Sequence, residues 1–357
     1  MTGDWSRRRA LGAIAAAPLA VSACAEDPVS APQELVSINM AQAGPPSPVP
    51  AATPTPGPDT TPIPEFDAGA LLESAFDQAL RMTAPIYVNG LGPFPFVIDT
   101  GANRSVVSRE VAQVCGLPWG GAAPMHGIAG VEQAPMVKVS RLRVGQVLSA
   151  NLRLPVLPRS RLGAEGLLGV DMLRDRRIRL DFKASHFEIT PSEGATLARG
   201  SNSRLNDPNG PVTVPAHYRF GQLVIFDANA VGRTVTAFLD SGSQITVGNM
   251  AMRKAILEAR PDLSPRFVER ELFSATAQQA HAELALLPDL RLGGQQITNL
   301  VAAFADLHIF DLWDLRTQPT VLIGVDVLRR FDQVVLDFGR REVSFWPPRG
   351  AKRVVGP

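Results

Sequence analysis

From Phe66 onward, short apolar stretches alternate with turns rich in Gly, Pro and Asn. Stretches of this length, bounded by turn-forming residues, are typical of β-strands. One segment differs, because between Asn249 and Arg260 the apolar residues fall at helical spacing and Pro261 follows directly. We expect a helix there, which the proline ends. The pattern as a whole predicts a mainly β fold with few helices.

The same order of signals occurs twice in this body. Each half has an apolar strand that ends in Asp, a hydroxyl residue and Gly, then an apolar segment with Gly, then a strand that ends in Leu-Asp-Phe. The corresponding positions, 99 and 240, 169 and 324, and 181 and 337, are 141, 155 and 156 residues apart. This near agreement predicts a duplicated domain with an insertion of about 14 residues in the second copy, which we place in the expected helix. We expect an N-terminal lobe over 66–205 and a C-terminal lobe over 206–357.

The first 24 residues resemble an export signal. Three arginines precede an apolar run over 11–23, which is too short to span a bilayer permanently. The arginines resemble a twin-arginine signal, and residues 21–24 resemble a bacterial lipobox, whose cleavage would leave a lipid on Cys24. The alternative is an ordinary signal peptide, cut near Ala23 or Ala25, that releases a soluble protein.

Residues 25–65 are dominated by Pro, Ala, Thr and Ser. Such a segment cannot bury enough apolar surface to offset its chain entropy, so we expect a disordered tether. Together with the leader, the tether predicts an exported protein on the periplasmic side of a bacterial membrane, held there by lipid.

Composition narrows the classes of partner and site. Lys and Arg number 35 and Asp and Glu number 34, so the net charge of +1 provides no field to hold nucleic acid. Cys115 is the one cysteine of the body, which excludes a disulfide within it. The histidines lack the spacing of metal ligands, so we expect no metal site and no cofactor. They are His126, His186, His217, His281 and His308.

The candidate chemistry lies in two short segments, Asp99-Thr100-Gly101 and Asp240-Ser241-Gly242. Each Asp follows an apolar strand, where burial makes ionisation costly, and two such carboxyls facing one another would share one proton. The charged carboxylate could deprotonate a water that attacks an amide carbonyl, while its protonated neighbour donates to the carbonyl oxygen. The glycines would allow close approach, and the hydroxyls could hydrogen-bond between the lobes.

The residue after each glycine differs between the two segments. It is Ala102 in the first and Ser243 in the second. A serine hydroxyl there could donate to the carboxylate and lower its pKa, whereas alanine cannot. We therefore expect the shared proton on Asp99 and the negative charge on Asp240.

On these residues the chain resembles the aspartic peptidases over most of 80–346. Its short lobes are similar to those of retropepsin-like members, although both lie on one chain as in pepsin. The resemblance implies two β-barrel lobes with a cleft between them and an apolar-apolar-Gly segment behind each Asp loop, which Leu167-Leu168-Gly169 and Leu322-Ile323-Gly324 fit. It also implies catalytic roles for Asp99 and Asp240, with active-site support from Thr100, Gly101, Ser241, Gly242 and Ser243.

The resemblance further implies a flap, a glycine-bearing hairpin that covers substrate. Gly127, Ile128, Ala129 and Gly130 fit this place in the first lobe, although an ordinary hairpin turn would use the same residues. The equivalent region of the second lobe, 273–279, has no glycine. We therefore expect one mobile flap.

These observations favour a membrane-tethered aspartic endopeptidase that cleaves polypeptide. Since both halves lie on one chain, we expect a monomer. One alternative is a non-catalytic, peptide-binding envelope lipoprotein with the same fold, and another is a structural envelope lipoprotein, which would leave the Asp pair unexplained. Both Asp residues, both hydroxyl residues and both glycines are present, which favours the enzyme because a binding groove alone needs none of them.

Overall fold

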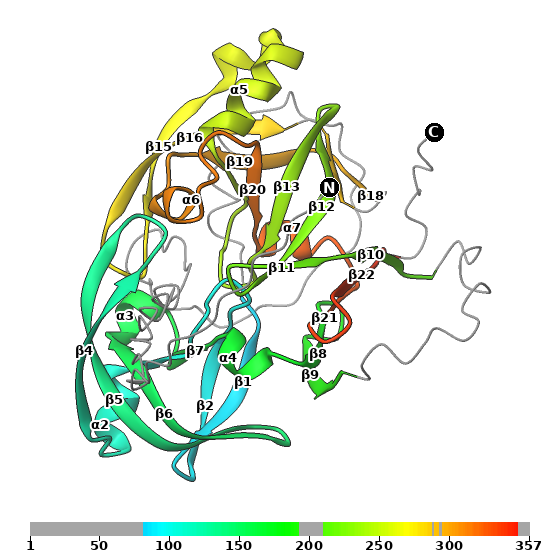
Figure 1. Cartoon of the computed structure of the whole chain (residues 1–357). Helices are drawn as coiled ribbons and strands as arrows, with labels where there is room; N and C mark the ends of the chain where they lie inside the picture. Colours follow the sequence, from blue (N-terminus) through cyan, green and yellow to red (C-terminus); the bar gives the residue numbers. More distant parts are fainter. Residues whose placement is uncertain (1–80, 193–209, 288, 293–294, 349–357) are drawn as a thin grey trace, which may run out of the picture. The chain divides into compact units, whose positions relative to one another are not determined.

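The computed structural model describes residues 81–192, 210–287, 289–292 and 295–348 (Figure 1). Strands dominate these residues, which confirms the predicted mainly β fold. The predicted export signal, the lipobox-like end at Cys24 and the tether lie outside the described residues, as does most of the expected boundary between the lobes. Within the described ranges, no helix is long and apolar enough to cross a membrane.

The first half folds into a closed barrel. Its strands pair in the order β1-β2-β7-β3-β6-β5, and a further pairing of β5 with β1 closes the ring, while β4 extends β5 as a hairpin. Asn89 and Gly90 form the two-residue turn from β1 to β2 with φ of 50° and 90°, as this dipeptide favours. The elements are β1 (Thr83–Val88), β2 (Leu91–Ile98), β3 (Val106–Ser108), α2 (Arg109–Val114), β4 (Trp119–His126), β5 (Val131–Val144), β6 (Val147–Leu157), α3 (Arg159–Leu162), β7 (Gly166–Leu168) and α4 (Val170–Leu173).

The second half repeats this order of pairing. Strands β12, β13, β20, β14, β19 and β16 follow one another as their counterparts do in the first barrel. Where the first half has the continuous β5, the second has β16 and then β17, which pairs with β12 as β5 pairs with β1. The elements are β11 (His217–Arg219), β12 (Gln222–Ala230), β13 (Arg233–Leu239), β14 (Val247–Gly248), α5 (Met250–Ala259), η1 (Pro261–Arg266), β15 (Val268–Phe273), β16 (Gln279–Leu287), β17 (Leu290–Leu292), β18 (Gln295–Ile297), β19 (Leu300–Phe304), α6 (His308–Leu312), β20 (Thr320–Ile323) and α7 (Val325–Leu328).

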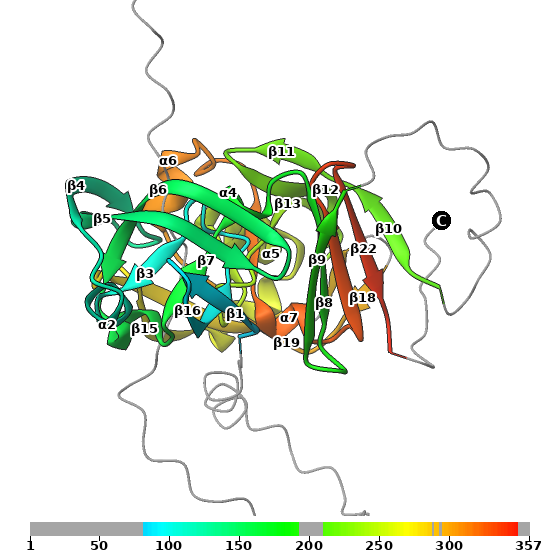
Figure 2. The ribbon, with the colours of Figure 1, turned by 90° about the horizontal axis from the view of Figure 1, so that it is seen from below.

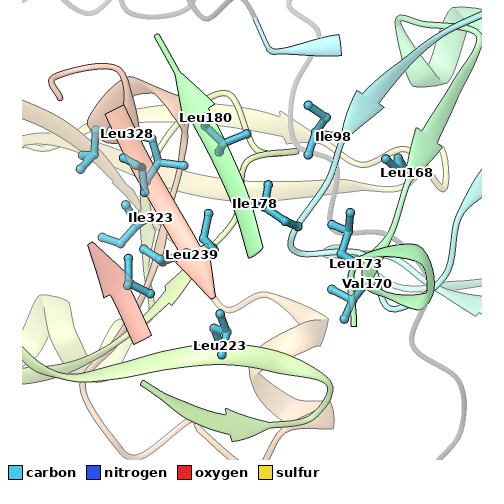
Figure 3. Packing of buried hydrophobic residues seen from close by; sticks show 14 of the residues in the cluster. Ile98, Leu168, Val170, Leu173, Ile178, Leu180, Leu223, Leu239, Ile323 and Leu328 are labelled. Carbon is cyan, nitrogen blue, oxygen red and sulfur yellow. The ribbon is translucent and has the colours of Figure 1, made fainter. Parts of the chain in front are cut away.

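A five-stranded sheet takes strands from both halves. Its order is β10-β22-β21-β8-β9, and β21 pairs antiparallel with β8 (Figure 2). Ile178 and Leu180 of β8 lie between Ile98 on one side and Leu239 on the other, in one apolar cluster (Figure 3). The sheet therefore joins the cores that support the two Asp loops. Its strands are β8 (Arg176–Asp181), β9 (His186–Pro191), β10 (Val212–Pro215), β21 (Gln333–Asp337) and β22 (Glu342–Trp346).

The helix predicted over 249–260 is confirmed as α5. Asn249 caps it by accepting a 2.8 Å hydrogen bond from the Met252 N–H, and η1 begins at Pro261. The shorter α2 holds the same place in the first half. However, β4 begins 20 residues after Asp99 and β15 begins 28 residues after Asp240, so this region holds only part of the extra length. The single insertion that the sequence suggested is therefore split, and the remainder lies between β15 and Gly324.

Candidate active site

The two Asp loops occupy equivalent places in the two halves. Asp99 follows β2 and its N–H donates to the Leu168 carbonyl at 3.0 Å, while Asp240 follows β13 and its N–H donates to the Ile323 carbonyl at 2.9 Å. In both cases the acceptor ends the parallel strand beside the Asp. The two residues are 0% and 1% exposed. The carboxyls are thus buried at the ends of strands, which is a costly environment for charge.

Each carboxyl packs against the glycine of the opposite loop. A Cβ added to Gly101 would lie 2.5 Å from Cγ of Asp240, and a Cβ added to Gly242 would lie 2.3 Å from Cγ of Asp99. Each glycine N–H also donates to the Asp of its own loop at 2.9 Å. No larger residue fits at either glycine without moving a carboxyl, so the two glycines allow the two acids to meet.

The hydroxyl residues connect the loops by two reciprocal pairs of hydrogen bonds. Thr100 Oγ1 donates to the Leu239 carbonyl at 2.8 Å and accepts from the Ser241 N–H at 3.0 Å. Ser241 Oγ donates to the Ile98 carbonyl at 2.7 Å and accepts from the Thr100 N–H at 3.1 Å. Because all these groups are buried, the hydroxyls set the approach of one loop to the other, as the sequence led us to expect.

A glutamine that the sequence did not single out also joins the halves. Gln222 begins β12, is buried, and donates from Nε2 to the Gly101 carbonyl at 2.9 Å and to Asn103 Oδ1 at 2.8 Å. The preceding Gly221 has a φ of 83°, and a Cβ there would lie 2.4 Å from Asn103 Oδ1. The turn before β12 therefore supports the Asp99 loop from the second half.

The Gly segments cross behind the Asp loops. A Cβ on Gly169 would lie 2.6 Å from the backbone carbon of Arg104, and one on Gly324 would lie 2.5 Å from that of Ile245. The short helices α4 and α7 follow directly. At their starts, Asp171 accepts from the Ser105 hydroxyl at 2.7 Å, and Asp326 accepts from the Thr246 hydroxyl at 2.8 Å. These buried bonds tie each Gly segment to the strand that follows its Asp loop.

Burial dominates the electrostatics of the pair. It raises the pKa of Asp99 to about 7, against the opposing effects of the Arg81 charge and of the Gly101 and Ala102 N–H groups. Burial and the neighbouring Asp99 charge raise the pKa of Asp240 well above that of an ordinary carboxyl. The pair therefore keeps one proton at neutral pH, and the positive charge of Arg81, which acts on both Asp99 and Asp240, favours ionisation of the other carboxyl.

The Ser243 side chain does not give Asp240 the support that the sequence led us to expect. The Ser243 hydroxyl donates to the Ile245 carbonyl at 2.7 Å and leaves the carboxylate to the Ser243 N–H, which is 3.1 Å from Asp240 Oδ1. Ala102 supplies the same N–H in the other loop. The prediction that this hydroxyl supports the carboxylate is wrong, because the hydroxyl donates to the Ile245 carbonyl instead.

A hairpin tip from each half reaches the other half. In the first, Gly127 N–H donates to the Gly130 carbonyl at 2.7 Å between β4 and β5, so the predicted hairpin is present. In the second, Ser274 N–H donates to the Gln278 carbonyl at 2.9 Å between β15 and β16, and Ala277 takes a φ of 61°. The absence of glycine thus did not prevent a hairpin in the region of the second half to which the sequence assigned no mobile flap.

The structure also brings together two histidines that the sequence treated as scattered. His126 Nδ1 lies 3.0 Å from His308 Nε2, although 182 residues separate them. Two nitrogens do not make a metal site, and the described residues contain no group of three or more His, Cys, Asp or Glu side chains able to hold a metal ion. Their spacing in the sequence offered no signal, because only the folded hairpin brings them together.

The comparisons with known proteins agree with the geometry in the first half. Residues 84–175 match the family model described as gag-polyprotein putative aspartyl protease. No curated protein matches the chain. The matched range contains the first Asp loop, the first hairpin and the first Gly segment. The resemblance to retropepsin-like aspartyl proteases is therefore confirmed, and the match identifies residues 84–175 as an aspartyl protease-like domain of the retropepsin type.

Proposed function

We propose that the protein hydrolyses peptide bonds with a water activated between Asp99 and Asp240. The observation that carries this proposal is the mutual packing of each carboxyl against the opposite glycine, which places two buried acids together with one proton between them. The match to an aspartyl protease model over residues 84–175 favours the same reaction class. One chain supplies both acids, so a second copy is not required for the pair.

In this mechanism the two acids have different roles. Asp99, whose ionised form is favoured by Arg81, removes a proton from the attacking water. Asp240, which holds the shared proton, donates it to the carbonyl oxygen as the tetrahedral intermediate forms. In each acid Oδ1 accepts from its own loop glycine, and Oδ2 is buried with no partner among the described residues. The Oδ2 atoms are therefore the ones available for the reaction.

The test is cleavage of a diverse peptide mixture, read by mass spectrometry. Asp99→Asn and Asp240→Asn should each abolish cleavage with the fold retained, because the acids act as a unit. Glu258→Gln, which removes an exposed carboxylate on α5, is the matched control and should cleave like the wild type. Substantial cleavage by either Asn variant, or inhibition by a chelator, would contradict the mechanism. Peptide binding without cleavage by the wild type would favour the alternative of a binding lipoprotein.

We also propose that the mature protein is lipid-anchored through Cys24 in the bacterial envelope. The support is the lipobox-like sequence that ends at this residue. Cys24→Ala should move the protein from the membrane fraction to the soluble envelope fraction, since acyl chains are the proposed anchor. Membrane association that persists in this variant would require another anchor.

A further inference from the structure

The tips of the β4–β5 and β15–β16 hairpins each pack against the opposite half. Ile128, at the first tip, is fully buried in the apolar cluster of the second half with Phe310 and Trp313. Ala275, at the second tip, is buried in a cluster of the first half with Met125. Figure 1 shows the first hairpin reaching α6 and the second hairpin. We call this arrangement, residues 126–131 against 274–278 and 307–313, the hairpin crossing.

Close contacts hold the crossing together. A Cβ on Gly127 would lie 2.3 Å from Thr276 Oγ1, so the tips meet with no spare room. Gln278 Nε2 donates to the Val131 carbonyl at 3.1 Å. The Ile309 N–H, in the first turn of α6, donates to the Ile128 carbonyl at 3.4 Å. These contacts are uncharged and do not depend on pH.

The His126–His308 pair is the one contact of the crossing, among those described, that can gain charge. His126 ends β4 immediately before the tip, and His308 begins α6. Their rings are stacked with centroids 5.3 Å apart and an interplanar angle of 10°. His126 is 7% exposed, and its Nε2 is buried with no partner among the described residues. The 3.0 Å bond therefore joins a buried ring of one half to a more exposed ring of the other.

The number of protons on the pair decides whether this bond survives. With both rings neutral, one nitrogen donates and the other accepts. With one proton added to the pair, the charged ring donates to the facing nitrogen of the neutral ring, so the hydrogen bond is kept. A second added proton places an N–H on each of the facing nitrogens, so the hydrogen bond is lost and two like charges face each other. Burial and His308 both oppose this second step, since they lower the pKa of His126.

Three carboxylates on the packed elements have partners of their own. Glu132, near the start of β5, pairs with Arg161. Asp311 of α6 pairs with Arg316, and Glu271 pairs with His281. The tip 274–278 contains no charged residue. Among the described residues, His308 is the one ionisable group that shifts the pKa of His126. The remaining ionisable groups on β5, β15 and β16 and just before α6 are Lys138, Arg141, Arg143, Glu269, Arg270, Glu283 and Asp306.

We propose that His126 and His308 are positioning residues that keep the hairpin crossing closed while they share at most one extra proton, and that a second proton releases it. Asp99 and Asp240 are closed off from solvent, so a polypeptide reaches them only after part of their surroundings moves. Release of the crossing in acid would provide that movement. The effect on peptide access rests on the proposed function, whereas the release itself does not.

Hydrogen exchange read by mass spectrometry tests the release without any substrate. The amides of 126–131 and 307–313 in the wild-type protein should be protected near neutral pH. Below the pH at which release of the crossing takes up the second proton, this protection should fall by about tenfold for each pH unit, after correction for the intrinsic exchange rate. Protection that persists down to about pH 4, well below the ordinary histidine range, would overturn the proposal.

Amide replacements provide the matched variant. The side-chain nitrogen or oxygen of Asn corresponds in position to Nδ1 of His126, and that of Gln corresponds to Nε2 of His308, so His126→Asn with His308→Gln can retain a neutral hydrogen bond. This double variant should stay protected in acid. His281→Asn removes an exposed histidine that pairs with Glu271 and should open like the wild type. Acid-induced opening that persists in the double variant would overturn the proposal.

Two further variants separate the possible failures. If the double variant is unprotected at every pH, His308→Gln decides alone, because its pair can never carry two charges, and acid-induced opening in it would again overturn the proposal. Asp99→Asn should open in acid like the wild type, which excludes protonation of the Asp pair as the cause. Normal release in a protein that cleaves no peptide would contradict only the proposed function.

Discussion

Replacing Thr100 by valine removes a buried hydroxyl while it preserves the shape of the side chain. Thr100 Oγ1 makes two hydrogen bonds to the opposite loop, to the Leu239 carbonyl and from the Ser241 N–H. Thr100→Val leaves both backbone groups buried without this partner. Each such group costs about 1–3 kcal/mol, so the loss of both should lower the free energy of unfolding by about 2–6 kcal/mol. This loss is large against the total stability of an ordinary domain.

The reciprocal change sharpens the prediction. Ser241→Ala deprives the Ile98 carbonyl and the Thr100 N–H of their partner, so it should cost a similar amount. The double variant should cost less than the sum of the two single losses, because loops that have already separated admit water to all four groups at once. Such coupling would show that the two hydroxyls act as one connection between the halves.

Urea unfolding, followed by far-UV circular dichroism, measures these losses. Thr213→Val is the matched control, because the exposed Thr213 also has a hydrogen-bonded hydroxyl, whose partner is the Ser344 hydroxyl at 2.7 Å. This variant should change the free energy of unfolding by less than about 0.5 kcal/mol. A Thr100→Val loss no larger than that of the control, or strict additivity with Ser241→Ala, would refute the reasoning.

Two predictions concern the glycine contacts and the buried carboxyl behind the second loop. Gly101→Ala should lower the free energy of unfolding by about 1–3 kcal/mol and abolish peptide cleavage, because its Cβ would lie 2.5 Å from Cγ of Asp240. Gly120→Ala is the control, because the nearest contact of its Cβ would be an ordinary 3.4 Å, and it should change neither stability nor cleavage. Equal effects of Gly101→Ala and Gly120→Ala in thermal unfolding and cleavage assays would contradict this reasoning. Burial raises the pKa of Asp326 to about 6, so the folded state retains a proton that the unfolded chain releases near pH 4. The stability that this retained proton provides is therefore lost as the pH rises from about 4 to about 6. Asp326→Asn should remove about 3 kcal/mol of that pH-dependent loss in urea unfolding, and parallel stability curves for variant and wild type would contradict the prediction.

Most of the secondary structure could be predicted from the sequence, because its signals are local. The mainly β fold follows from short apolar runs between turn residues, and the Asn89-Gly90 turn follows from the preference of that dipeptide for positive φ. Helix α5 follows from helical spacing together with Pro261. The turn of the second hairpin was not predicted, because Ala277 adopts a left-handed conformation that the sequence does not signal.

For the candidate site, too, the sequence predicts some features and not others. Two repeated Asp-hydroxyl-Gly segments were sufficient to indicate a pair of acids, since the order of residues along the chain carries the repeat. The distribution of the proton between the acids depends on directions in space. The Ser243 hydroxyl turns to the Ile245 carbonyl, and Arg81 lies where its charge acts on Asp99. Neither relation leaves a trace in residue spacing.

The order of residues along the chain is enough to predict the candidate chemistry, namely two acids at the ends of apolar strands, each followed by a hydroxyl and a glycine. How these groups act on one another follows from the folded arrangement, because hydrogen bonds and charge interactions depend on distances of a few ångströms between residues far apart in the chain. The support of Gly101 by Gln222 and the pairing of His126 with His308 exist only after the two halves have folded against each other.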